Sequence, residues 1–352
     1  MRRGLIARSQ DELPDAVLDA RLARLRAAMA AAGLDALVVY TNNTRPAGVS
    51  WLTGFVPYWS EALLVVPRQG EPVLVVALTY RVKTWIERTS RVADVIHTPR
   101  IGLEAGRRIA AVKADAAVGV VDLDHLAAGI ADDLAEGGPR LTLTDASELF
   151  ARLRAKADPT EVALATRAAS IAHQAMTRIA RDGAAGRVIA DVEAAARQQG
   201  AEEIYIAAAP DLAADARLRR LEGDVALGRA FALRASVAYK GSWVRLVRTV
   251  HADDKADRRD AEAFAAAVAS LPDVGKLAAF PSWLVEGCRT TQPLDALMGS
   301  RIAPPPASLP LPDLVSVQAR IDIDGAPVLF GAPALLGAPG EPAHLLASPA
   351  FD

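Results

Sequence analysis

Apolar and polar residues follow two different periods along the first 150 residues of the chain. Between Asp15 and Gly33 the apolar residues recur at helical spacing, which predicts an amphipathic helix that ends at the glycine. The short apolar runs that follow are typical of buried strands. We predict strands at residues 36–41, 62–67, 72–77, 92–96, 117–122 and 141–143, and helices at residues 81–88, 102–114, 126–135 and 145–154. Strands that alternate with helices favour an α/β domain over residues 1–150.

A second domain is predicted over residues 155–352. Asp158 and Pro159 are residue types preferred at the N-cap and at the first position of a helix, so a helix should begin there. Further helices are predicted at residues 187–199 and 257–270, and strands at residues 203–207, 229–237, 243–250, 314–323 and 327–336. The Asp-Gly pair between the last two strands indicates a β-hairpin.

The stretch from Arg234 to Thr249 predicts another β-hairpin. Residues that favour strands flank the sequence Tyr239-Lys240-Gly241, and its glycine can adopt the positive φ that a tight turn needs. Arg234 and Arg245 stand eleven positions apart in this stretch. Two arginines at the ends of such a hairpin can converge across it.

Composition excludes several classes of protein. A formal net charge of −2 provides no basic surface for nucleic acid or anionic lipid, so neither nucleic acid nor a membrane is expected as a partner. No segment reaches the roughly 18 apolar residues of a membrane span. The single cysteine, Cys288, excludes an intramolecular disulfide and a thiolate metal cluster. We therefore expect a globular cytoplasmic protein, and the frequent Ala and Arg indicate a GC-rich, bacterial genome.

Four segments of the chain carry a resemblance to a known family. They are Arg21-Leu-Ala-Arg-Leu-Arg26, Gly33-Leu-Asp-Ala-Leu-Val38, Trp51-Leu-Thr-Gly-Phe55 and Leu153-Arg-Ala-Lys-Ala-Asp-Pro-Thr-Glu161. Together they resemble the creatinase, prolidase and aminopeptidase P family. The resemblance implies an α/β creatinase-like N-terminal domain followed by an α+β pita-bread domain, here shortened and degenerate. It also implies a homodimer, or a heterodimer with a related pita-bread protein.

The same resemblance implies where metal ligands should lie. Active members carry two Asp ligands eleven residues apart on the hairpin, and Arg234 and Arg245 stand at those positions here. The positions of two further carboxylates fall on Gln318 and on Gly331 or Ala332, and the interval in which the ligand His is expected contains no His. Guanidinium groups cannot be deprotonated and cannot replace carboxylates around divalent ions. We therefore predict no dimetal centre and no cofactor, unless the register of this comparison is wrong and the chain is an ordinary metallopeptidase.

A pita-bread cleft without metal would still need a counter-charge for its arginines. One solution is a small anionic or guanidino ligand, held partly by bidentate guanidinium contacts and by aromatic stacking. The predicted ligand-binding residues are Arg234, Arg245, Tyr239, Trp243, Gln318 and Arg320. The alternative is a set of structural salt bridges to Asp224, Asp322 or Asp324.

Catalytic residues are not identified by any complete motif, and three candidates remain. Creatinase, by resemblance, hydrolyses a C–N bond without metal through a His with carboxylate partners, and His173 and His251 are the candidates here. His173 falls on an apolar helix face, which is more typical of a core residue. His251 precedes an acidic and basic run, residues 253–260, that indicates a solvated helix start. Cys288 is the third candidate, because a thiolate beside Arg289 could act as a nucleophile.

Two hypotheses of function follow. The first is an Xaa-Pro-peptidase-like protein without a dimetal centre, a pseudopeptidase that serves as a binding or partner subunit. The alternative is a metal-independent, creatinase-like C–N hydrolase that acts on a small carboxylate- or guanidino-bearing substrate.

Overall fold

The structure is a computed structural model in which the chain divides into two compact units, with the boundary between Ala155 and Lys156. It describes residues 8–42, 47–57, 60–92, 94–177, 179–181, 183–221, 223–252, 254–269, 282–287, 312–323, 325–338 and 340–348. Residues 282–287 are described by their backbone alone. Cys288, Asp324 and most of the stretch expected to hold the family's ligand His lie outside the described residues. No helix in the described part of the chain is both long and apolar enough to cross a bilayer.

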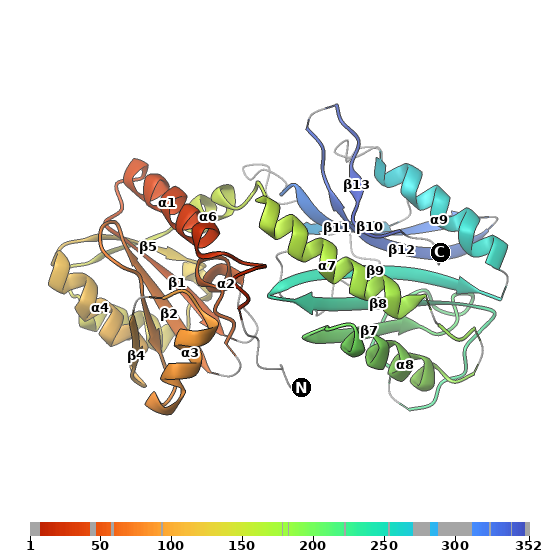
Figure 1. Cartoon of the computed structure of the whole chain (residues 1–352), viewed down its shortest axis with the longest axis horizontal. Helices are drawn as coiled ribbons and strands as arrows, with labels where there is room; N and C mark the ends of the chain where they lie inside the picture. The colour runs from red at the N-terminus through yellow and green to blue at the C-terminus, as the bar shows by residue number, and fades with distance from the viewer. Residues whose placement is uncertain are drawn as a thin grey trace. The chain divides into compact units, whose positions relative to one another are not determined.

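The N-terminal unit is a mixed sheet with helices on both faces (Figure 1). Its helices are α1 (Asp15–Ala31), α2 (Ala47–Thr53), α3 (Lys83–Thr89), α4 (Ile101–Val112), α5 (Ala128–Gly137) and α6 (Ser147–Leu153), with short 3-10 helices at Tyr80–Val82 and Leu123–His125. Its strands are β1 (Ala36–Asn42), β2 (Glu61–Pro67), β3 (Val73–Val76), β4 (Asp94–His97), β5 (Ala117–Val121) and β6 (Thr142–Asp145). The strand order is β4-β3-β2-β1-β5-β6, with β1, β5 and β6 parallel and β2 antiparallel to its neighbours. The α/β prediction is confirmed.

The centre of this sheet is buried on both faces because successive side chains of a strand point to opposite sides. In β1, Leu37 and Val39 pack with α1, α2 and α6, whereas Ala36 and Val38 pack with α4 and α5. A continuous apolar run therefore suits this position, and the interpretation of residues 36–41 as a buried strand is confirmed.

Helices α4 and α5 pack at the closest approach that glycine allows. A Cβ atom added to Gly102 would lie 2.3 Å from the carbonyl oxygen of Ile130, and one added to Gly106 would lie 2.4 Å from that of Leu134. Gly137 meets the carbonyl oxygen of Leu103 in the same way, at 2.2 Å. Each glycine thus lets the backbone of one helix touch the backbone of the other.

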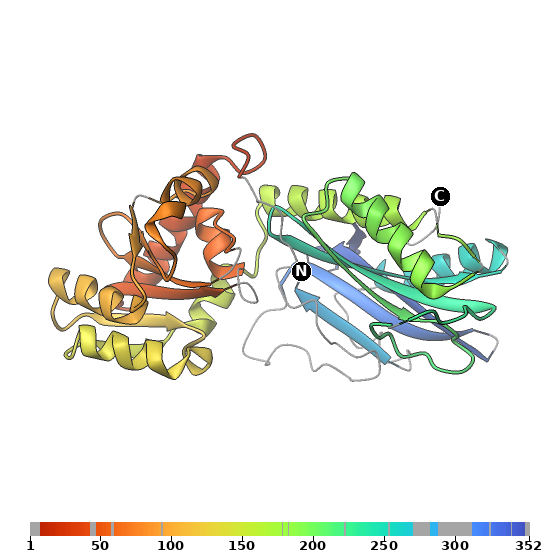
Figure 2. The same cartoon turned by 90° about the horizontal axis from the view of Figure 1, so that it is seen from below.

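The C-terminal unit is an antiparallel sheet with helices packed on one face. Its helices are α7 (Pro159–Met176), α8 (Ala185–Gln198) and α9 (Asp254–Ala269), and its strands are β7 (Glu203–Ala209), β8 (Ala230–Tyr239), β9 (Ser242–His251), β10 (Ser282–Gly287), β11 (Leu314–Ile323), β12 (Ala326–Leu335) and β13 (His344–Leu345). The strand order is β10-β11-β12-β9-β8-β7, and β13 pairs with β12. Figure 2 shows α7 and α8, in green, on the same side of these strands.

The first helix of this unit begins where the sequence predicts. The Asp158 side chain accepts a hydrogen bond from the Glu161 N–H at 2.9 Å, and the Glu161 side chain accepts one from the Asp158 N–H at 3.2 Å. This capping box satisfies two backbone donors at the helix start, and Pro159 follows at the first helical position. The apolar face of α7 then packs on Leu233, Val244 and their neighbours in the sheet.

Candidate functional site

A two-residue turn joins β8 to β9 and fixes their register. Lys240 and Gly241 both have positive φ, 47° and 78°, as the favoured hairpin turn with a right-handed twist requires. Tyr239 consequently pairs with Ser242, and the pairing continues to Ala230 and His251 at the open end. The predicted hairpin is confirmed.

This register places Arg234 and Arg245 on one face of the sheet. Arg234 pairs with Val247, and Arg245, two residues before Val247, pairs with Ser236, so the two arginines are diagonal neighbours. Both are buried, with 5% and 4% of their surface exposed. Their face is the one opposite the helices, because the alternating residues Leu233, Ala235 and Val237 form the helix-covered core.

Gln318 lies on the same row of the sheet as Arg234. The row runs from Arg234 through Val247 and Gly331 to Gln318, which is fully buried. A Cβ atom at Gly331 would lie 2.8 Å from the Val247 side chain and 2.9 Å from that of Gln318. There is no room for a carboxylate side chain at this glycine, and the adjacent Ala332 packs in the helix-covered core instead.

Aromatic residues extend this face toward the edge of the sheet. Trp243 is buried and stacks on Tyr205 of β7, with ring centroids 5.6 Å apart and an interplanar angle of 24°. The Tyr205 hydroxyl donates to the Glu203 carboxylate at 2.8 Å, and Glu203 is buried too. Sequence reasoning missed Tyr205 and Glu203, although their alternation along a predicted strand places them on one face. We name the surface formed by Tyr205, Arg234, Trp243, Arg245 and Gln318 the arginine face.

Two predicted ligand-binding residues are not brought into the arginine face. Tyr239 lies on the helix-covered side, where the guanidinium of Arg167 is 5.8 Å from its ring centroid. Arg320 shares the strand face of Gln318 but pairs with Asp322 at 3.2 Å, with more than a third of each side chain exposed. Asp322 therefore forms its ion pair with Arg320.

The arginine face does not fit a pair of divalent metal ions. The positions that the family resemblance assigns to carboxylate ligands hold Arg234, Arg245, Gln318 and Gly331. Within the described residues, no three His, Cys, Asp or Glu side chains gather in a way that could hold a metal ion. Two buried guanidinium cations repel a divalent ion.

His173 takes part in a polar cluster on the helix-covered side. A guanidinium N–H of the buried Arg248 lies 2.6 Å from the His173 Nδ1, and the same guanidinium donates to the Ser348 carbonyl. The His173 Nδ1 also lies 3.3 Å from the Ser348 carbonyl oxygen, so His173, Arg248 and Ser348 form one polar cluster. Arg248 pairs with Leu233 and so lies on the helix-covered side of the sheet. His173, which contacts Arg248, is therefore on the opposite side of the sheet from the arginine face.

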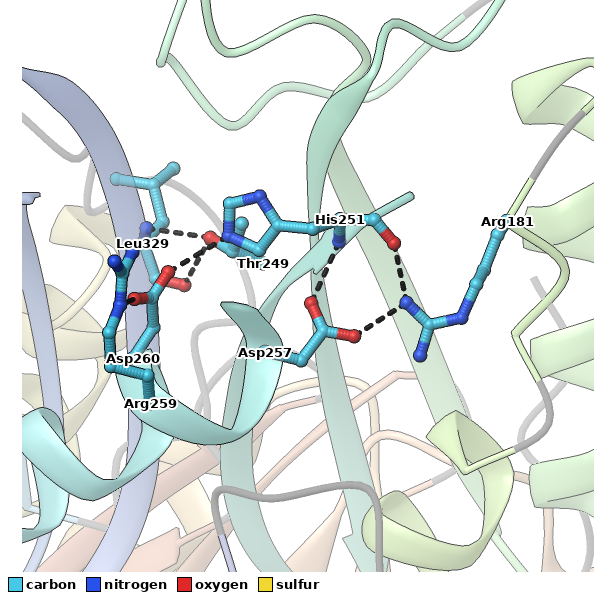
Figure 3. A network of polar contacts seen from close by, with 7 residues as sticks. All are labelled: Arg181, Thr249, His251, Asp257, Arg259, Asp260 and Leu329. Atoms are coloured by element: carbon cyan, nitrogen blue, oxygen red, sulfur yellow. Dashed lines mark hydrogen bonds and ion pairs between the residues drawn. The ribbon is translucent and has the colours of Figure 1, made fainter. Parts of the chain in front are cut away.

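His251 lies in the network drawn in Figure 3, at the junction of β9 and α9. Its ring Nε2 is 2.9 Å from the Asp260 carboxylate, which also accepts a hydrogen bond from Arg259. Asp257 accepts the His251 backbone N–H at 2.8 Å and pairs with Arg181 at 2.6 Å. His251 therefore has the carboxylate partner that a general base needs, which the sequence did not reveal.

The interpretation of residues 253–260 as a solvated helix start is wrong for its two paired aspartates. Asp257 is 4% exposed and Asp260 is fully buried. Burial raises the pKa of Asp257 above its usual value, against the lowering effect of the His251 N–H and of Arg181. The chain buries these carboxylates because each has a hydrogen-bonding partner on a neighbouring segment.

The family resemblance agrees with a comparison to known protein families. Residues 21–156 match the family of the Creatinase/Prolidase N-terminal domain. The N-terminal unit is a Creatinase/Prolidase N-terminal domain. No curated protein matches the sequence.

The Creatinase/Prolidase N-terminal domain and the pita-bread unit together have the fold of solved prolidases. The prolidase from Pyrococcus horikoshii OT3 superposes with a TM-score of 0.68 at 14% identity, over 93% of this chain and 97% of that one. The X-Pro aminopeptidase from Thermotoga maritima MSB8 gives 0.68 at 13% identity, over 93% and 97%. The N-terminal domain of the FACT complex subunit SPT16 from Cicer arietinum (chickpea) gives 0.62 at 13% identity, over 96% and 98%. The predicted fold class is thereby confirmed, and at these identities the likeness concerns the fold.

Proposed function

We propose that this chain is a prolidase-fold protein without a dimetal centre that acts as a non-catalytic binding or partner subunit. The observation that carries the proposal is the burial of Arg234 and Arg245 on one sheet face, where the resemblance places metal carboxylates. Binding two divalent ions beside two fixed positive charges would cost Coulomb energy that no protonation change can relieve. The scaffold would thus persist while peptidase chemistry is lost.

A role as a partner subunit is supported by the range of proteins that share the fold. One of the structures similar to this chain is described as a subunit of the FACT complex, whereas others are peptidases. The proposed partner is a second copy of this chain or a related pita-bread protein. In a heterodimer, this chain would contribute its surface and the related chain would contribute the metal centre.

The first test measures metal and peptidase activity together. We expect purified protein, incubated with excess Mn²⁺, Co²⁺ or Zn²⁺ and then desalted, to retain far less than one ion per chain and to leave Xaa-Pro dipeptides intact. A metal-dependent prolidase treated in the same way is the positive control. Two tightly held ions per chain with Xaa-Pro cleavage would overturn the proposal.

A second candidate function is a metal-independent enzyme, or a receptor, that takes a small carboxylate- or guanidino-bearing ligand at the arginine face. It is favoured by one observation: Arg234, Arg245 and Gln318 share this face with the stacked Trp243. Guanidinium groups bind carboxylates through two parallel N–H bonds, and an aromatic face packs on the body of a ligand.

Succinate is a suitable probe for this second candidate. Arg245→Lys keeps the charge but removes the bidentate fork, so we expect it to weaken succinate binding about tenfold in calorimetric titration. Arg320→Lys is the matched control, since Arg320 is partly exposed and paired with Asp322, and it should leave binding unchanged. A parent protein that ignores succinate, or equal effects of both substitutions, would exclude an anion site at this face.

A further inference from the structure

The Creatinase/Prolidase N-terminal domain contains a hollow of about 310 Å³ that no catalytic role accounts for. It lies between the C-terminal end of α4 and the strands β1, β2 and β3. Its wall is mainly apolar, formed by side chains such as Ala36, Val65, Val73 and Ile109. The volume is at the lower end of the roughly 300–1,000 Å³ of small-molecule sites.

The hollow opens to solvent beside an exposed apolar side chain. Val112, the last residue of α4, lines the hollow and is 82% exposed. Val112 and the apolar side chains of the wall line the same hollow, so together they expose apolar surface to water. A ligand with an apolar body would remove this surface from water, which is favourable in proportion to its area.

The cations that line the hollow are already held by carboxylates. Lys113 pairs with Asp35 at 2.7 Å, and its hydrogen bond is the main reason that the pKa of Asp35 is lowered. Arg68, which is outside the lining, pairs with the same carboxylate at 3.0 Å. Arg108 pairs with Glu104 at 2.8 Å. Both cations of the lining, Lys113 and Arg108, thus have a carboxylate partner.

Glu71 is different from the other charges of the lining. It is exposed at the mouth and enters no ion pair among the residues that the structure describes. The C-terminal carbonyls of α4 are at the same mouth, because Val112 and Lys113 line it, and they add a partial negative charge. Glu71 and this helix end are therefore the groups of the lining with which a cationic ligand can pair.

We propose that this hollow is a binding site for small aliphatic primary amines. The apolar chain of the ligand fills the space between α4 and the sheet, and its ammonium group remains at the mouth beside the Glu71 carboxylate. The apolar chain supplies the affinity, and the ammonium–carboxylate pair supplies the discrimination.

Titration with three probes of equal chain length tests the site: hexylammonium, hexanol and hexanoate, followed by chemical-shift changes in the full-length protein. Hexylammonium should bind about tenfold more tightly than hexanoate. Glu71→Gln should weaken hexylammonium binding about fivefold and leave hexanol binding unchanged. Glu262→Gln, an exposed glutamate of α9 in the other unit, is the matched control and should change neither.

A second variant tests the hollow independently of the charge. Ala111 lines the hollow from an exposed position of α4, so Ala111→Trp can fill the space without disturbing the core. It should abolish binding of both hexylammonium and hexanol, while the unfolding midpoint stays close to that of the parent. Preferred binding of hexanoate, undiminished hexylammonium binding in Glu71→Gln, or undiminished binding in Ala111→Trp would overturn the proposal.

Discussion

Replacing Gly106 by Ala is expected to lower the free energy of unfolding of the N-terminal domain by about 3 kcal/mol, an overpacking cost at the upper end of the usual range. The new Cβ would lie 2.4 Å from the Leu134 carbonyl oxygen and 3.0 Å from the Gly137 backbone. Neither obstacle is a flexible side chain, so α4 and α5 would have to move apart and lose contact along their length. Urea denaturation monitored by circular dichroism measures the change.

Gly129→Ala is the matched control in the same helix pair. Gly129 lies in α5 and a Cβ added there meets nothing within 4 Å. Since Ala is the better helix former, this substitution should stabilise the domain by about 0.5–1 kcal/mol. The close-packing interpretation fails if the two substitutions have the same sign.

The architecture was predictable where the sequence pattern states a local preference. The Asp158-Pro159 start of α7 needs only neighbours three residues away, and the apolar run of β1 needs only a sheet covered on both faces. Other features were not predictable, because they depend on contacts between distant segments. The α4–α5 glycines appear in the sequence as ordinary weak helix formers, and only the packed pair shows why a side chain is excluded.

The candidate site shows the same division. The position of the two arginines follows from the turn of the hairpin: once Lys240-Gly241 is the turn, Arg234 and Arg245 must share a face of the sheet. The same alternation excludes Tyr239 from that face, because it stands five residues from Arg234 in one strand, and an odd separation reverses the side. That exclusion could have been made from the sequence. The burial of Asp257 could not, since its partner Arg181 lies 76 residues away.

Replacing Asp257 by Ala should produce the second large effect, a loss of about 3 kcal/mol of unfolding free energy near neutral pH, because removing a buried carboxyl takes the acceptor away from two hydrogen-bond donors at once. The His251 N–H and the Arg181 guanidinium would both lose this acceptor, and the start of α9 would keep the His251–Asp260 contact as its other polar connection to the end of β9. Asp191→Ala is the control: its pair with Arg187 on α8 is exposed, so the change should stay within about 0.5 kcal/mol.

The pH dependence of the Asp257→Ala effect distinguishes a buried carboxyl from a surface one. Burial raises the pKa of Asp257, so between its usual value and the raised value the folded protein binds more protons at this site than the unfolded chain does. The contribution of Asp257 to stability therefore decreases as pH rises through that window. The free-energy difference between the parent and Asp257→Ala should accordingly be larger at the acidic end of the window than at neutral pH. A difference that instead grows as pH rises would show that hydrogen bonding to His251 and Arg181 outweighs burial, and that the pKa is lowered.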